Sequence, residues 1–151
     1  MGVLNIRIAT TKNQEQAFMK QLLTDVKALD SMIENNMFND TITRIGAEQE
    51  VCLVDKNFRP SPINVEILNK SNNKNLTPEL AKFNLEFNIT PQEFKGNCFE
   101  LMEKEILSDI EETRKIVQSL DSEIILTGIL PTIRKFDLDA KNITPFDRFY
   151  A

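Results

Sequence analysis

Two hydrophobic periodicities divide the chain into helices and strands. Apolar residues recur at three- and four-residue steps after Thr11 and again after Asn97, which predicts two long helices, each with one buried face. Both helices begin with a capping-box pattern, Thr11 with Gln14 and Asn97 with Glu100. The two stripes are Phe18, Leu22, Val26, Leu29, Ile33 and Met37, then Phe99, Met102, Ile106, Ile110, Val117 and Leu120. In the second helix acids come early and basic residues late, as the helix dipole favours.

Alternation with a period of two predicts strands at 44–55, 82–90 and 123–128. In the first of these, Glu48 and Glu50 fall on the same face, because side chains two residues apart point the same way. In the second, Glu86 lies on the polar side, opposite an apolar side that includes Phe87. The segment 63–68 fits either a strand or a helix.

The segment that begins Thr77, Pro78, Glu79 predicts the start of a short helix, with threonine as the cap and proline in the first turn. Long helices separated by antiparallel-looking strands indicate an α+β fold. We expect two long helices on one face of a mainly antiparallel sheet, whose other face is polar. The polar face is where a functional site is expected.

The composition narrows the classes of function. At 151 residues, 41% hydrophobic and 27% charged, the chain has room for a single domain. The net charge of -5 gives no basic surface for nucleic acid, and the absence of a signal-peptide pattern or apolar span predicts a cytoplasmic protein with no membrane contact. Cys52 and Cys98 lack the spacing of a zinc or redox site and are predicted to be buried thiols.

The sequence contains no histidine and no glycine-rich phosphate loop. Any chemistry must therefore use carboxylates, amines, hydroxyls or the backbone. On a strand, the α-carbons of Glu48 and Glu50 are about 6.6 Å apart, so the two side chains can meet at one cation or reach two neighbouring ones. Glu86 can complete the set, and oxygen ligands alone favour a hard cation such as Mg²⁺ or Mn²⁺. Taken without other information, the same pattern also fits glutamates that are simply solvated on an exposed sheet face.

Several segments resemble those of one enzyme family. RIGAEQEVCLVD at 44–55 resembles the first metal-binding strand of the glutamate-cysteine ligase superfamily of carboxylate-amine ligases. TPELAKFNLEFNITP at 77–91 resembles the next acidic segment of that family, and this likeness adds Glu79 to the metal set of Glu48, Glu50 and Glu86. TGILP at 127–131 and the closing PFDRFY also resemble the family, so the likeness runs from about 44 to 151. Arg148, in that last segment, is the candidate substrate or nucleotide contact, with an ordinary surface cation as the alternative.

The resemblance implies a fold and a reaction. The fold would be part of a glutamine synthetase-like domain, a curved, mainly antiparallel sheet whose concave face holds Mg²⁺ and ATP. ATP would phosphorylate the γ-carboxylate of glutamate or a related acid. The amine of cysteine or another amino compound would then attack the acyl phosphate and form an amide, as in the synthesis of glutathione precursors. The metal-bound carboxylates would orient the phosphates.

Two departures from the family leave other interpretations open. Leu130 stands where many members have a histidine, and members are several hundred residues long. We therefore expect residues 1–151 to form the N-terminal part of a longer ligase domain, inactive by itself, or a shortened relative of the family. The first alternative is a non-catalytic module on the same scaffold that binds an amino acid or a nucleotide. The second is an interaction domain that pairs with another copy of the chain as a homodimer.

Overall fold

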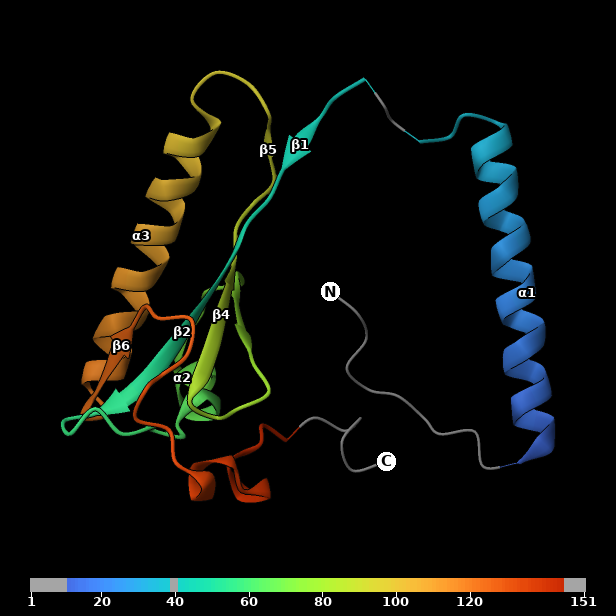
Figure 1. Cartoon of the computed structure of the whole chain (residues 1–151). Coiled ribbons are helices and arrows are strands. Elements are labelled where there is room, and N and C mark those ends of the chain that lie inside the picture. The colour runs from blue at the N-terminus through green and yellow to red at the C-terminus, as the bar shows by residue number, and fades with distance from the viewer. Residues whose placement is uncertain (1–10, 39–40, 146–151) are drawn as a thin grey trace. The chain divides into compact units, whose positions relative to one another are not determined.

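The computed structural model describes residues 11–38 and 41–145, which belong to two separate units (Figure 1). One unit spans Thr43–Thr144 and contains every strand of the described residues. The other consists of Met1–Ile42 with Pro145–Ala151, and its described part is mainly helix α1, Lys12–Glu34. No helix among the described residues is both long and apolar enough to cross a membrane.

Helix α1 begins as its sequence predicts. The backbone N–H of Gln14 donates to Thr11 Oγ1 at 3.3 Å, and the backbone N–H of Thr11 donates to Gln14 Oε1 at 3.1 Å, which completes the capping box. The predicted buried face is not confirmed, because no residue of α1 is buried among the residues that the structure describes. The apolar stripe from Phe18 to Ile33 is 43% to 63% exposed. Periodicity finds the apolar side of a helix, but it does not find the surface that covers it.

The sheet of the Thr43–Thr144 unit is antiparallel throughout, which confirms the α+β class. Its strand order is β3-β4-β2-β6, with β3 at Leu76–Pro78, β4 at Asn84–Asn88, β2 at Glu48–Asp55 and β6 at Ser122–Ile125. Strand β1, Arg44–Ile45, leaves this sheet and pairs with β5, Gln92–Glu93. The single strand predicted over 44–55 is therefore split at residues 46 and 47. The alternation of exposure in β2 ends at Glu50, because the residues from Val51 to Val54 are all buried.

One face of the sheet holds the core. Helix α3, Cys98–Gln118, and the short helix α2, Asn64–Lys70, cover this face. The sheet contributes Val51, Leu53, Leu76, Leu85, Phe87 and Ile124, and the helices contribute Ile67, Met102, Ile110 and Val117. The segment 63–68, which fitted strand or helix, falls mostly in α2. The expectation of two long helices on one face of the sheet is not confirmed, because one long helix and one short helix cover the core face within this unit.

Two local predictions about caps fail. The predicted helix start at Thr77 is wrong, because Leu76–Pro78 is strand β3 and Thr77 pairs with Glu86. Burial of Leu76 against β4 outweighs the local capping preference, and proline is tolerated because β3 is an edge strand. Asn97 is the N-cap residue of α3, but its side chain makes no capping hydrogen bond. The predicted capping box with Glu100 is therefore wrong as well.

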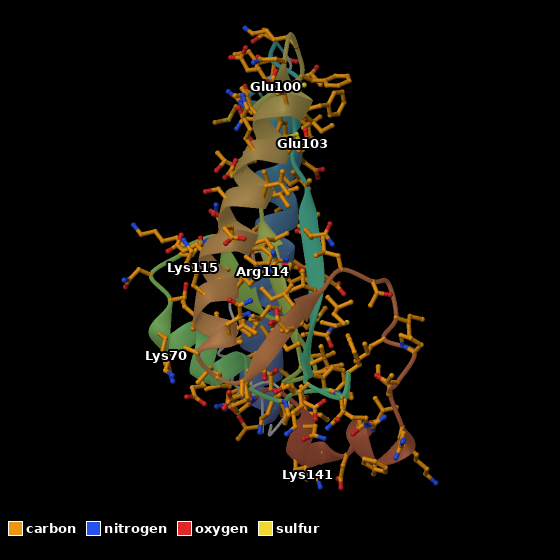
Figure 2. All side chains as sticks on the ribbon, turned by 90° about the vertical axis from the view of Figure 1, so that its left-hand side faces the viewer. Lys70, Glu100, Glu103, Arg114, Lys115 and Lys141 are labelled. Carbon is orange, nitrogen blue, oxygen red and sulfur yellow. The ribbon has the colours of Figure 1, made fainter. Side chains whose placement is uncertain are left out.

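The charge gradient predicted along α3 is confirmed. Figure 2 views the helix from its outer side, with Glu100 and Glu103 near its beginning and Arg114 and Lys115 near its end. Glu100 also pairs with Lys104 at 2.7 Å. Acids near the positive end of the helix dipole and bases near the negative end each stabilise the helix modestly.

Glu105 ties α3 to the end of β4 and to the loop before β3. Its Oε1 atom accepts hydrogen bonds from the Thr90 hydroxyl at 2.6 Å, the Thr90 backbone N–H at 3.1 Å and Asn75 Nδ2 at 3.1 Å. We expect Glu105→Ala to lower the free energy of unfolding by about 1–2 kcal/mol, because three donors lose a charged acceptor. Urea denaturation measures this change. Glu103→Ala, an exposed position on the same helix, is the control and should change stability by less than about 0.5 kcal/mol. Equal midpoints for the two variants would remove the structural role given to Glu105.

Candidate metal site

The sheet face opposite the core carries the candidate site. Val51 and Leu53 point into the core and are fully buried, so Glu48 and Glu50, at the alternate positions of β2, project from the other face. Glu86 does the same on β4, between the buried residues Leu85 and Phe87. The shared polar face predicted for Glu50 and Glu86 is confirmed.

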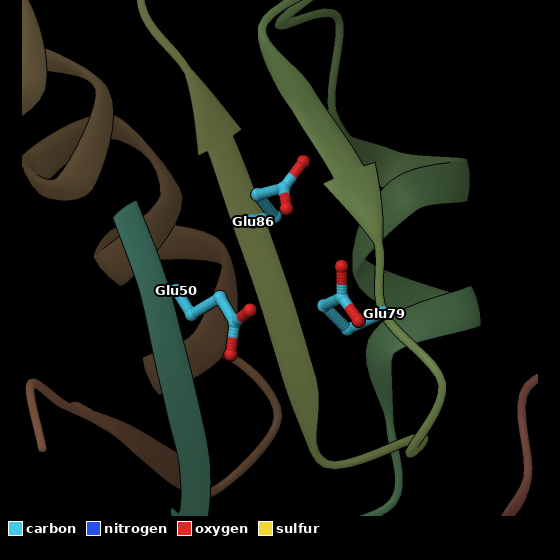
Figure 3. A group of neighbouring side chains, drawn as sticks. All are labelled: Glu50, Glu79 and Glu86. Atoms are coloured by element: carbon cyan, nitrogen blue, oxygen red, sulfur yellow. The ribbon is translucent and has the colours of Figure 1, made fainter. Parts of the chain in front are cut away.

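Strand register brings three of the four candidate glutamates together. Glu50 on β2 lies directly opposite Glu86 on β4, and Glu79 follows β3 on the other side of β4. One carboxylate oxygen from each of Glu50, Glu79 and Glu86 lies within 4.8 Å of the others. Figure 3 shows the three carboxylates pointing toward one another across β4. Glu50 is exposed, while Glu79 and Glu86 are partly buried, so the cluster opens to solvent on one side.

Two neighbouring side chains fix the orientation of Glu86. Asn88 Nδ2 donates to Glu86 Oε1 at 2.7 Å, and the Thr77 hydroxyl donates to the same oxygen at 3.2 Å. Asn88 also donates to Thr77 Oγ1 at 2.9 Å, so the three residues form one network. Both donors bind Oε1, and the carboxyl group of Glu86 also interacts with that of Glu79. Thr77, which the sequence predicts to be a helix cap, is instead a strand residue that donates to Glu86.

The surroundings of Glu79 raise the cost of ionising its carboxyl group. Partial burial raises the pKa of Glu79 above its ordinary value, and the nearby carboxylates of Glu86 and Glu50 raise it further. The backbone N–H of Leu80 donates to Glu79 Oε2 at 3.1 Å and acts in the opposite direction. A divalent cation among the three groups would offset the repulsion, and oxygen donors suit Mg²⁺ or Mn²⁺. The donor set therefore fits such an ion.

Glu79→Gln should stabilise the protein near neutral pH in the absence of divalent cations. A carboxyl group with a raised pKa in the folded state stabilises the fold at low pH, and this contribution is lost as the pH rises through the folded-state pKa. The glutamine side chain cannot ionise, so the melting temperature of the variant should exceed that of the wild type at pH 7.5 in chelator. The difference should shrink as the pH falls toward the unfolded-state pKa of about 4.3. Melting curves across this pH range test the prediction, and a constant difference would contradict it.

The other residues singled out from the sequence are Glu48, Arg148 and the two cysteines. Glu48 lies on the same face as Glu50 but pairs with Asn88, and it is outside the group of three converging carboxylates. Arg148 falls outside the described residues. The prediction of buried thiols is confirmed for both Cys52 and Cys98.

Further along β2, beyond Glu50, the sheet face that carries the glutamates becomes apolar and buried. Cys52 and Val54 share the face of Glu50, and Leu130 covers them in a small buried cluster. Asn84 Nδ2 lies 3.6 Å from the sulfur of Cys52 at the edge of this cluster. Burial, the largest influence, raises the pKa of the Cys52 thiol, which keeps it protonated and unreactive. Leu130 thus covers the part of the face around Cys52 and Val54, while Glu50 remains exposed to solvent.

Comparison of the chain with protein-family models, with curated proteins and with solved structures finds no match.

Proposed function

We propose that this chain supplies the metal-binding face of an ATP-dependent carboxylate-amine ligase of the glutamate-cysteine ligase type. The observation that carries the proposal is the convergence of Glu50, Glu79 and Glu86 on the open face of an antiparallel sheet. The resemblance of segments 44–55 and 77–91 to that family supports the same assignment. The proposal includes a glutamine synthetase-like continuation of the sheet, with the acidic face as its concave side.

In this proposal the three glutamates hold Mg²⁺ or Mn²⁺ together with the phosphates of ATP. A cation held in this way neutralises charge on the phosphates during transfer. The γ-carboxylate of glutamate or a related acid takes the terminal phosphoryl group, ADP leaves, and an amine displaces phosphate from the acyl phosphate to give the amide. Asn88 and Thr77 hold Glu86 in position, and Arg148 is the proposed contact for substrate or nucleotide.

Calorimetric titration with Mg²⁺ and Mn²⁺, with and without ATP, tests the proposal. We expect saturable binding that tightens in the presence of ATP, because a cation bound by few carboxylates keeps positions open for phosphate oxygens. Glu50→Gln should weaken the binding by at least about tenfold, because a direct ligand should cost at least as much as an outer-shell partner. Unchanged affinity in this variant would reject the metal assignment.

Two further variants sharpen the titration. Glu103→Gln, on the outer side of α3, makes the same charge change away from the cluster and should leave the affinity unchanged. Titration of Glu48→Gln distinguishes a site that holds one cation from a site that holds two. Loss of one equivalent of bound metal would place Glu48 at a second cation, whereas an unchanged stoichiometry and affinity would restrict the site to the three converging carboxylates.

A non-catalytic binding module is the second candidate, and the position of Leu130 favours it. Its side chain is buried against Cys52 and Val54, so an apolar group stands on the acidic face where many members of the resembled family have a histidine. Such a module would bind nucleotide or amino acid without forming a product. Because the chain is expected to be inactive by itself, the full-length gene product is the protein to assay. Release of phosphate from ATP that requires glutamate would support the ligase, whereas saturable nucleotide binding with no phosphate release by that protein would support the module.

A further inference from the structure

We draw no further inference here: the strongest candidate, the exposed apolar stripe along helix α1 formed by Phe18, Leu22, Val26, Leu29 and Ile33, carries nothing because nothing in the described residues shows what covers it.

Discussion

Replacing Glu86 with glutamine is expected to abolish the stabilisation of the protein by Mn²⁺ while leaving the fold intact. Glu86 lies between Glu50 and Glu79, so its loss removes the carboxylate that both others approach. Glutamine has nearly the same shape, and its amide oxygen can still accept the hydrogen bonds from Asn88 and Thr77. The strand pairing therefore survives, and the loss is confined to charge and metal coordination.

The expected size of this effect follows from mass action. At a cation concentration about 100 times the dissociation constant, binding raises the free energy of unfolding by about 2.7 kcal/mol. Chemical denaturation of the wild type with Mn²⁺ and with chelator should show this difference, and Glu86→Gln should lose most of it. In chelator the variant should be at least as stable as the wild type, because one repelling charge is gone. A variant that is stabilised by Mn²⁺ as strongly as the wild type would exclude Glu86 as a ligand.

Phe87→Ala is expected to have the largest effect on stability, a loss of about 3–5 kcal/mol. The side chain of Phe87 is 0% exposed and stands on the core face of β4, where it pairs with Gln49 of β2 and Leu76 of β3. Truncation leaves a cavity between the sheet and its helices that neighbouring side chains fill only in part. This cost is a large fraction of the total stability of an ordinary domain, so the variant should be partly unfolded at 37 °C.

Phe99→Ala is the matched control for this loss. Phe99 is 61% exposed on α3, and its ring meets Phe94 edge-on at 5.8 Å between centroids. Removing it should cost about 0.5–1.5 kcal/mol, the value of an aromatic pair. Urea denaturation of the two variants should show a difference in the free energy of unfolding of at least about 1.5 kcal/mol. Similar losses would mean that Phe87 does not lie at the centre of the core.

The period-two pattern assigned four residues of β2 and β4 to the correct face of the sheet. It placed Glu50 and Glu86 on the polar side and Leu85 and Phe87 on the apolar side, and both assignments are confirmed. The pattern could not say which glutamates meet, because that depends on the register between strands that are distant in sequence. Glu86 lies opposite Glu50 rather than Glu48, and this one fact decides the composition of the cluster.

Local signals failed where tertiary contacts outweigh them. Thr77 and Pro78 have the residue types of a helix start, but the burial of Leu76 and pairing with β4 make the segment an edge strand. The same change of structure turns Thr77 from an expected cap into a hydrogen-bond donor to Glu86. Helix α1 shows a second limit of sequence patterns, which do not identify the surface that would cover an apolar face. Its apolar stripe predicts a buried face, and none of its described residues is buried.

Anomalous diffraction from crystals of the chain soaked in Mn²⁺ tests the central claim most directly, because it locates the ion without relying on a mutation. The account predicts one strong peak with an oxygen of Glu50, Glu79 and Glu86 each at about 2.0–2.3 Å, as is usual for hard cations of this size. A peak only at another acidic surface, such as the open pocket lined by Asp55, Asp121 and Glu123, would contradict it. So would the absence of any peak at a Mn²⁺ concentration that saturates binding in solution.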